Sequence, residues 1–162
     1  MKLEWMGEYR DVVEALIHYC NIYAGVYRQE KMHFGEVAYS YSQIQVLEYL
    51  LENEERCENM SRIAERLGIT RSNFTKITQR LEAKGLVEKA PMPGSGRELS
   101  VSVTPLGRAL YEDYAQQIGW HFSPMFRSLE KLSPEQLSCV REALESAMAG
   151  SDYMRRRAGE KE

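Results

Sequence analysis

The stretch that decides the fold runs from Met60 to Val87 and reads MSRIAERLGITRSNFTKITQRLEAKGLV. It contains two short helical patterns joined by residues 68–70, and a connection this short forces two helices to cross at a steep angle. Each pattern carries apolar side chains at helical spacing. They are Ile63, Ala64 and Leu67 in the first pattern, and Phe74, Ile77 and Leu81, with Thr78 beside them, in the second. The stretch therefore predicts a helix-turn-helix.

The second helix, with Thr70 as its expected cap and Gly85 as its expected end, leaves a polar side facing outward. Amide, hydroxyl and cationic side chains suit base edges and phosphates in a major groove, which admits one helix. The predicted DNA contacts of this helix are Arg71, Ser72, Asn73, Thr75, Lys76, Gln79 and Arg80. A helix that only faces solvent would also be polar on this side, so the pattern alone leaves both interpretations open.

The residues after Gly85 predict a β-hairpin. Residues 86–89 form a short strand pattern, a turn rich in proline and glycine follows, and Leu99, Val101 and Val103 alternate with polar residues as a second strand. A hairpin attached to a helix-turn-helix makes a winged helix. Arg97 lies near the tip, where a guanidinium can reach a minor groove and contact phosphate.

These features, in this order, resemble the MarR family of bacterial transcription regulators. The most specific parts are LEAKGLV at 81–87 and TPLG at 104–107, the start of the next helix, and the resemblance covers roughly residues 36–150. It implies a mostly α fold with a small β-wing, in which N- and C-terminal dimerisation helices flank the winged helix-turn-helix. It also implies a homodimer on a pseudo-palindromic operator. One departure is Ser95, since the family usually has an aspartate two residues before the wing arginine, so we expect a less steady wing.

Helical patterns are also expected on both sides of this lobe. The first 32 residues carry two apolar stripes, which is more apolar surface than a monomer leaves exposed. Residues 33–41 are expected to form a loop, after which Ser42 caps a scaffold helix, and Ser61 is the expected cap of the first helix of the helix-turn-helix.

Two further helices are expected after the wing. Thr104 and Pro105 begin one of them, and Gly119 and Pro124 are expected to bend or break it. Residues 133–136 form a capping-box start for the last helix, which is expected to end at residue 150. The predicted divisions are an N-terminal dimerisation helix at 1–35, a winged helix-turn-helix lobe at 36–104, C-terminal dimerisation helices at 105–150 and a flexible tail at 151–162.

The net charge of −3 hides an uneven distribution along the chain. Residues 1–55 hold 4 basic and 10 acidic side chains, residues 56–108 hold 10 and 5, and residues 109–162 hold 7 and 9. The predicted DNA-binding lobe thus carries a charge of +5. Because phosphate neutralisation dominates affinity for nucleic acids, this local charge matters more than the total.

Several other classes of protein and site are not indicated. The opening MKLEWMGEYR lacks the features of a signal peptide, and no apolar run is long enough to span a membrane, so we expect a cytoplasmic protein with no membrane partner. Cys20, Cys57 and Cys139 are far apart, so we expect buried free thiols and no metal. No cofactor is expected. No Ser/His/Asp order, phosphate loop or HExxH is present, so we do not expect an enzyme.

The resemblance also suggests how DNA binding is controlled. Family members commonly bind small aromatic or phenolic molecules between the dimer helices and the DNA-binding lobe, and tyrosines offer such ligands an apolar body with a polar tip. The predicted effector residues are Tyr19, Tyr23, Tyr41, Tyr111 and Tyr114, although ordinary core packing also uses tyrosines. One alternative is redox sensing through Cys20, because a branch of the family uses a cysteine of the first helix. Another is a winged helix that binds protein instead of DNA.

Overall fold

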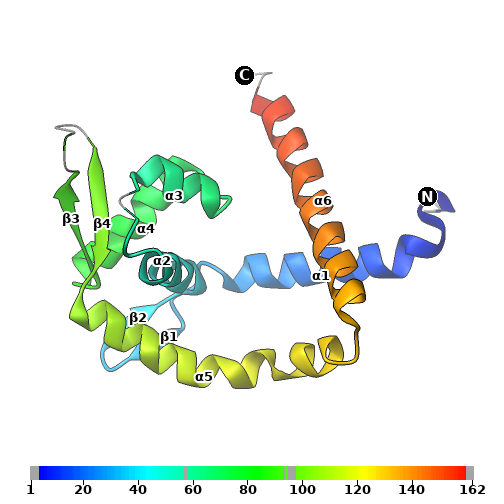
Figure 1. The fold of residues 1–162 in the computed structure, drawn as a ribbon, viewed down its shortest axis with the longest axis horizontal. Helices are drawn as coiled ribbons and strands as arrows, with labels where there is room; N and C mark the ends of the chain where they lie inside the picture. Colours follow the sequence, from blue (N-terminus) through cyan, green and yellow to red (C-terminus); the bar gives the residue numbers. More distant parts are fainter. Residues whose placement is uncertain (1–3, 57, 93, 95–97, 160–162) are drawn as a thin grey trace. The chain divides into compact units, whose positions relative to one another are not determined.

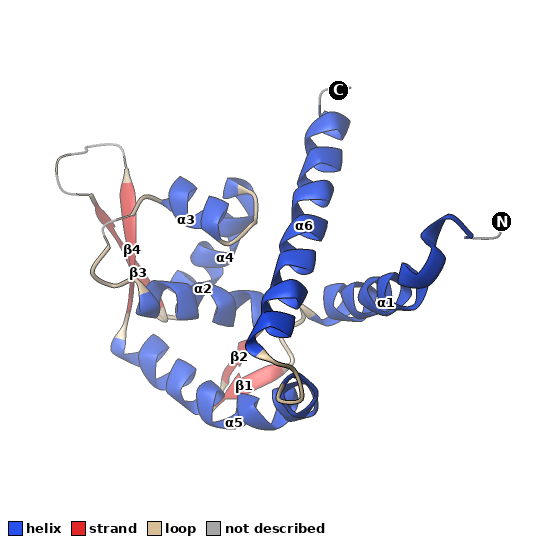
Figure 2. Ribbon diagram, turned by 45° about the vertical axis from the view of Figure 1, so that its right-hand side comes forward, coloured by secondary structure: helices blue, strands red, loops and turns tan. Residues whose placement is uncertain are grey.

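The computed structural model describes residues 4–56, 58–92, 94 and 98–159 of the 162-residue chain, which forms two compact units at 1–115 and 116–162. Its elements, in order, are η1 Glu4–Tyr9, α1 Arg10–Val26, β1 Met32–Phe34, β2 Val37–Tyr39, α2 Tyr41–Glu52, α3 Met60–Arg66, α4 Arg71–Ala83, β3 Val87–Pro91, β4 Leu99–Val103, α5 Pro105–Leu129 and α6 Pro134–Gly159 (Figure 1). The protein is mostly helical with two small antiparallel hairpins (Figure 2), which confirms the predicted fold class.

The predicted helix-turn-helix is confirmed as α3 and α4. Ile63 and Ala64 of α3, together with the predicted stripe of α4, lie in a core that α2, β3 and the first turns of α5 complete. Phe74 is fully buried at its centre. The turn between the two helices contains Gly68 at φ +65°, a left-handed conformation that glycine adopts without steric cost.

The wing is confirmed as the β3–β4 hairpin. The two strands pair antiparallel from Val87 opposite Val103 to Pro91 opposite Leu99. Val87 and Val101 are buried against the helices, so the base of the wing belongs to the core. The tip residues Ser95 and Arg97, with their predicted roles, lie outside the described residues.

Two of the predicted helix caps are wrong by two residues. Ser40, not Ser42, caps α2 in a capping box, because its backbone N–H is satisfied by the side chain of Gln43 at 3.0 Å. Asn59, not Ser61, caps α3, where its side-chain oxygen accepts from the N–H of Arg62 at 3.0 Å. In each case the helix begins two residues earlier than predicted, so its cap also lies two residues earlier. The predicted cap Thr70 is confirmed, since it accepts from the N–H of Asn73 at 3.1 Å.

The loop predicted at 33–41 is also wrong, because much of it forms the β1–β2 hairpin (Figure 2). Gly35, at φ +57°, lies in the turn between strands in which Met32 pairs with Tyr39 and Phe34 with Val37. These four side chains are partly or fully buried against the core. These apolar side chains occupy every second position within each strand, which is the pattern of a β-strand. The prediction of a loop gave more weight to Gly35 and to the polar residues after Tyr39.

The helix after the wing, which was expected to bend or break at Gly119 and Pro124, is not broken. Helix α5 begins at Pro105 with Thr104 as its cap and continues through Gly119 and Pro124 to Leu129. An internal proline removes one hydrogen bond and destabilises a helix by about 3 kcal/mol. The other residues of this 25-residue helix outweigh that cost. Similarly, α6 does not end at residue 150 but runs to Gly159, because one internal glycine costs only about 1 kcal/mol relative to alanine.

Helix α1 packs more loosely than the other helices of the first unit. It follows a 3₁₀ turn that is interrupted at Gly7, and within Arg10–Val26 no side chain is buried. Val13, Leu16, Tyr23 and Tyr27 are half-buried, whereas Val12, Tyr19, Ile22 and Val26 form an exposed apolar stripe on a neighbouring side. None of the helices in the described part of the chain is both long and apolar enough to cross a membrane.

Candidate nucleic-acid interface

Helix α4 has one buried side and one exposed side, as its sequence predicts. With 13 residues it is about 20 Å long, which suits a major groove about 12 Å wide. Arg71, Ser72, Lys76, Gln79 and Arg80 are exposed, and Asn73 and Thr75 are half-buried. The hydroxyl of Thr75 donates to the backbone oxygen of Arg71 at 2.9 Å, so Thr75 has only its oxygen left to accept from DNA.

The cations of residues 56–108 differ in whether a carboxylate holds them. Several are held by carboxylates: Arg66 pairs with Glu58 at 3.1 Å, Lys84 with Glu30 at 2.8 Å, Lys89 with Glu82 at 2.7 Å, and Arg108 with Glu54. In contrast, Arg71, Lys76 and Arg80 form no ion pair with any described residue. The exposed side of α4 thus keeps three cations available to an external anion.

Lys84, at the C-terminal end of α4, was missed by the sequence analysis. Its ammonium donates to Glu30 Oε1 at 2.8 Å, to the backbone oxygen of Ala38 at 2.6 Å and to Gln43 Oε1 at 3.3 Å. This hydrogen bond to Glu30 is the largest cause that lowers the pKa of the Glu30 carboxyl below its ordinary value. No sequence motif predicts this cluster, because its members come from separate segments of the chain.

The five predicted effector tyrosines lie in one continuous cluster of rings, although they come from α1, α2 and α5. Ring centroids are 5.9 Å apart for Tyr19 and Tyr23, 6.3 Å for Tyr23 and Tyr41, 6.5 Å for Tyr41 and Tyr114, and 6.3 Å for Tyr111 and Tyr114. Tyr27 and Tyr39 extend the same cluster. Burial raises the pKa of Tyr23 and of Tyr111 to about 12, so their hydroxyls stay neutral donors at physiological pH.

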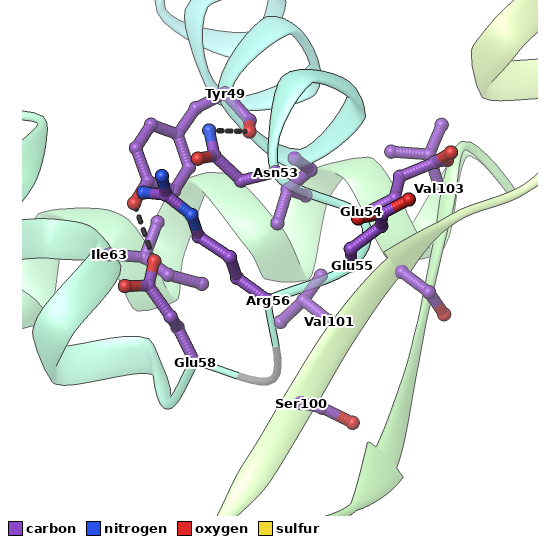
Figure 3. Close-up of a pocket in the computed structure, with 12 residues that line it drawn as sticks. Tyr49, Asn53, Glu54, Glu55, Arg56, Glu58, Ile63, Ser100, Val101 and Val103 are labelled. Carbon is purple, nitrogen blue, oxygen red and sulfur yellow. Dashed lines mark hydrogen bonds between the residues drawn. The ribbon is translucent and has the colours of Figure 1, made fainter.

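A cavity of about 300 Å³ lies away from these tyrosines, between the end of α2 and the wing (Figure 3). Tyr49, Leu50, Ile63 and Val101 contribute to its lining, which also includes the charged residues Glu54, Glu55, Arg56 and Glu58. The Tyr49 hydroxyl donates to Glu58 at 2.5 Å and lowers the pKa of that carboxyl. None of the predicted effector residues lines this cavity.

The cysteines are not buried as expected. Cys20 and Cys139 are exposed, because α1 and α6 present these positions to solvent in the single chain, and Cys57 lies outside the described residues. In the part of the chain that the structure describes, no three His, Cys, Asp or Glu side chains come together as metal ligands.

Comparison with known proteins shows which proteins have a similar sequence in this lobe. A family profile described as MarR family matches residues 39–98, from the last residue of β2 to the residue before β4. YfiV, an HTH-type transcriptional regulator of Bacillus subtilis (strain 168), is 32% identical over 105 residues, which make up 65% of this chain and 62% of YfiV. PapX, an HTH-type transcriptional regulator of Escherichia coli, is 32% identical over 74 residues, or 46% of this chain and 45% of PapX. The matches thus span less than two thirds of either relative.

A solved structure extends the likeness in fold to most of the chain. Wild-type Lactococcus lactis ZitR in complex with DNA has a TM-score of 0.61 and 16% identity, with 90% of this chain and 98% of ZitR covered. At this identity the likeness shows the fold alone. The winged helix-turn-helix of this chain is thus similar to the MarR family profile over residues 39–98 and to two HTH-type transcriptional regulators over 105 and 74 residues.

Proposed function

We propose that the protein is a homodimeric transcriptional regulator that binds double-stranded DNA in the cytoplasm at a pseudo-palindromic site. Helix α4 of each copy would enter one of two successive major grooves. A small aromatic or phenolic molecule would release the protein from DNA or modulate its binding.

One observation carries the proposal of DNA binding: on the exposed side of α4, Arg71, Lys76 and Arg80 form no ion pair with any described residue. The neighbouring Gln79 and Asn73 add amides of the kind that form bidentate hydrogen bonds with adenine. A side that combines unpaired cations and amides serves phosphate and base contacts together.

Exposed apolar surface supports the proposal of a homodimer. On α1 the stripe includes Val12, 72% exposed, and Ile22, 57% exposed. On α6, Leu137, Val140, Leu144 and Met148 form a second stripe that is also exposed in the single chain. Contiguous apolar surface of this kind marks an interface, and a second copy supplies matching apolar stripes.

DNA binding is tested by selecting duplexes from a random pool and then measuring affinity by fluorescence anisotropy across a series of salt concentrations. Affinity should fall linearly with salt on logarithmic axes. Lys76→Ala should make the slope shallower by about one, and Arg97→Ala should do the same if the wing contacts phosphate. Lys131→Ala, an exposed cation of the other unit, is the control and should leave the slope unchanged. Binding that does not respond to salt, or selection of no duplex, would rule out this function in favour of a protein-binding module.

Sedimentation of the purified protein tests the homodimer. Val12→Asp, which places a charge in the exposed stripe of α1, should shift the protein toward the monomer. Asn21→Asp adds the same charge on the opposite side of the helix and should leave the dimer intact. A monomer at micromolar concentration in the unmutated protein would contradict the proposal.

The effector is tested on the selected duplex with phenol and hydroxybenzoate in one arm and hydrogen peroxide in the other. Release by a phenolic compound that is lost in Tyr23→Ala would support the tyrosine cluster as the effector site. Release by peroxide that is lost in Cys20→Ser would instead assign the input to the exposed thiol of Cys20.

A further inference from the structure

The ammonium of Lys84 joins three segments that are distant in sequence. Its acceptors are Glu30 in the α1–β1 connection, Ala38 in β2 and Gln43 in the first turn of α2, at 2.6–3.3 Å. The Gln43 side chain also donates to Glu30 Oε1 at 3.1 Å and accepts from the N–H of Ser40 at 3.0 Å. These contacts connect Lys84, the residue that directly follows α4, with the segment that leads from α1 to α2. We call Lys84, Glu30 and Gln43 the Lys84 cluster.

The geometry of this cluster leaves Lys84 little capacity to bind DNA. An ammonium has three donors, and here the three acceptors match them in number. The side chain is 22% exposed, and that of Glu30 is 35% exposed, so the ion pair is partly shielded from water. Lys84 therefore differs from Lys76, which is exposed and has no ion-pair partner among the described residues.

We propose that Lys84 is a positioning residue for DNA recognition: it fixes the orientation of α4 against the α1–α2 connection and does not contact DNA itself. This inference rests on the proposed function. Arg71, Lys76 and Gln79 lie on the same rigid helix, so a rotation of α4 at its C-terminal end would displace all of them from the groove together.

Two simpler roles for Lys84 make different predictions. A lysine that binds phosphate would lower the salt slope when it is removed. A lysine that only balances the negative end of the helix dipole would be replaced equally well by arginine, which keeps the charge. A positioning role depends on a compact ammonium with three donors, which the planar guanidinium of arginine does not reproduce.

Glu30 gives the sharpest distinction. In a purely electrostatic account, Glu30→Gln removes a negative charge from a DNA-binding lobe and should strengthen DNA binding. If the cluster positions α4, the same change should weaken binding, because it removes the principal charged partner of Lys84. The two accounts thus predict changes of opposite sign.

The experiment measures affinity and salt slope on the duplex selected by the unmutated protein, for Lys84→Met, Lys84→Arg, Glu30→Gln and the double variant. Thermal unfolding of each variant confirms that it is folded. We expect Lys84→Met to bind on the order of tenfold more weakly with an unchanged salt slope. Lys84→Arg should restore binding only in part, and Glu30→Gln should weaken it. The double variant should bind no more weakly than Lys84→Met, because both changes break one interaction.

The matched control is Lys89→Met, which removes the ion pair of Lys89 with Glu82, at 2.7 Å, in the same lobe. Because the β3–β4 ladder already holds Lys89 in register, this variant should keep its affinity within about twofold. An unchanged affinity in Lys84→Met, a salt slope shallower by about one, or stronger binding by Glu30→Gln would each overturn the positioning role while DNA binding stands. If the unmutated protein selects no duplex, the proposed function fails and this inference fails with it.

Discussion

Gly107→Ala tests whether the start of α5 is packed as tightly against the winged helix-turn-helix lobe as the structure shows. A Cβ atom at Gly107 would lie 2.1 Å from the backbone oxygen of Leu86 and 2.8 Å from Val103 Cγ1. Carbon and oxygen atoms in contact are ordinarily about 3.3 Å apart, so one backbone must retreat by about 1 Å. That movement would strain the hydrogen bond from the N–H of Thr104 to the Leu86 oxygen, 3.1 Å, which anchors the beginning of α5.

The magnitude follows from two opposing effects. Overpacking in a tight core destabilises by about 1–3 kcal/mol, and a strained hydrogen bond adds about 1 kcal/mol. Alanine in place of glycine inside a helix returns about 1 kcal/mol. We therefore expect Gly107→Ala to lower the free energy of unfolding by about 2 kcal/mol, and the melting temperature by about 4–8 °C for a protein of this size.

Gly119→Ala is the matched control, because Gly119 lies in the same helix and a Cβ atom added there would meet no atom within 4 Å. It should stabilise the protein by up to about 1 kcal/mol. Urea unfolding followed by circular dichroism, at one fixed protein concentration, gives both values. A Gly107→Ala variant as stable as the unmutated protein, or as stable as Gly119→Ala, would refute the close packing of α5 on Leu86.

Three further predictions concern the core, base recognition and pH. Phe74→Ala, at a fully buried position, should destabilise the protein by about 3–5 kcal/mol in urea unfolding and abolish DNA binding through loss of the lobe. Gln79→Ala should leave the fold intact and change sequence preference by roughly 1–3 kcal/mol at one base pair in a competition assay; equal loss on all sequences would point to a phosphate contact instead. Because Lys84 lowers the pKa of Glu30 below its ordinary value of 4.5, the stability from this pair is present above pH 4.5 and is lost as pH falls through the lower native value. Glu30→Gln should therefore reduce stability at pH 7 and lose that effect in acid.

The lobe could be predicted from its sequence because its signals are local. The 3.6-residue spacing of Phe74, Ile77 and Leu81, and the alternation of Leu99, Val101 and Val103, each lie within one element, and both elements form as expected. The resemblance to the MarR family likewise rests on motifs of seven residues or fewer, and the family profile matches the same lobe.

The features that were missed depend on contacts between distant segments or on small differences in local energy. Ser40 and Ser42 are both good caps, and the reach of Gln43 decides between them. Pro124 is a poor helix residue, yet the rest of a 25-residue helix outweighs it. Lys84 meets acceptors 41–54 residues away, one of them a backbone oxygen that carries no sequence signal. The exposure of Cys20 likewise depends on which other segments cover α1, and no local sequence pattern predicts that.

The loose attachment of α1 has a consequence for the behaviour of dilute protein. A helix of 17 residues without a single buried side chain gains little from tertiary packing, and isolated helices of this length are marginal in water. If the proposed homodimer covers α1, helix content should decline as the protein is diluted, and the frayed segment should be the first site of proteolytic cleavage. Copies synthesised at a low rate in a cell would then be degraded faster than copies that have already paired, so the protein would accumulate only above a minimum rate of synthesis.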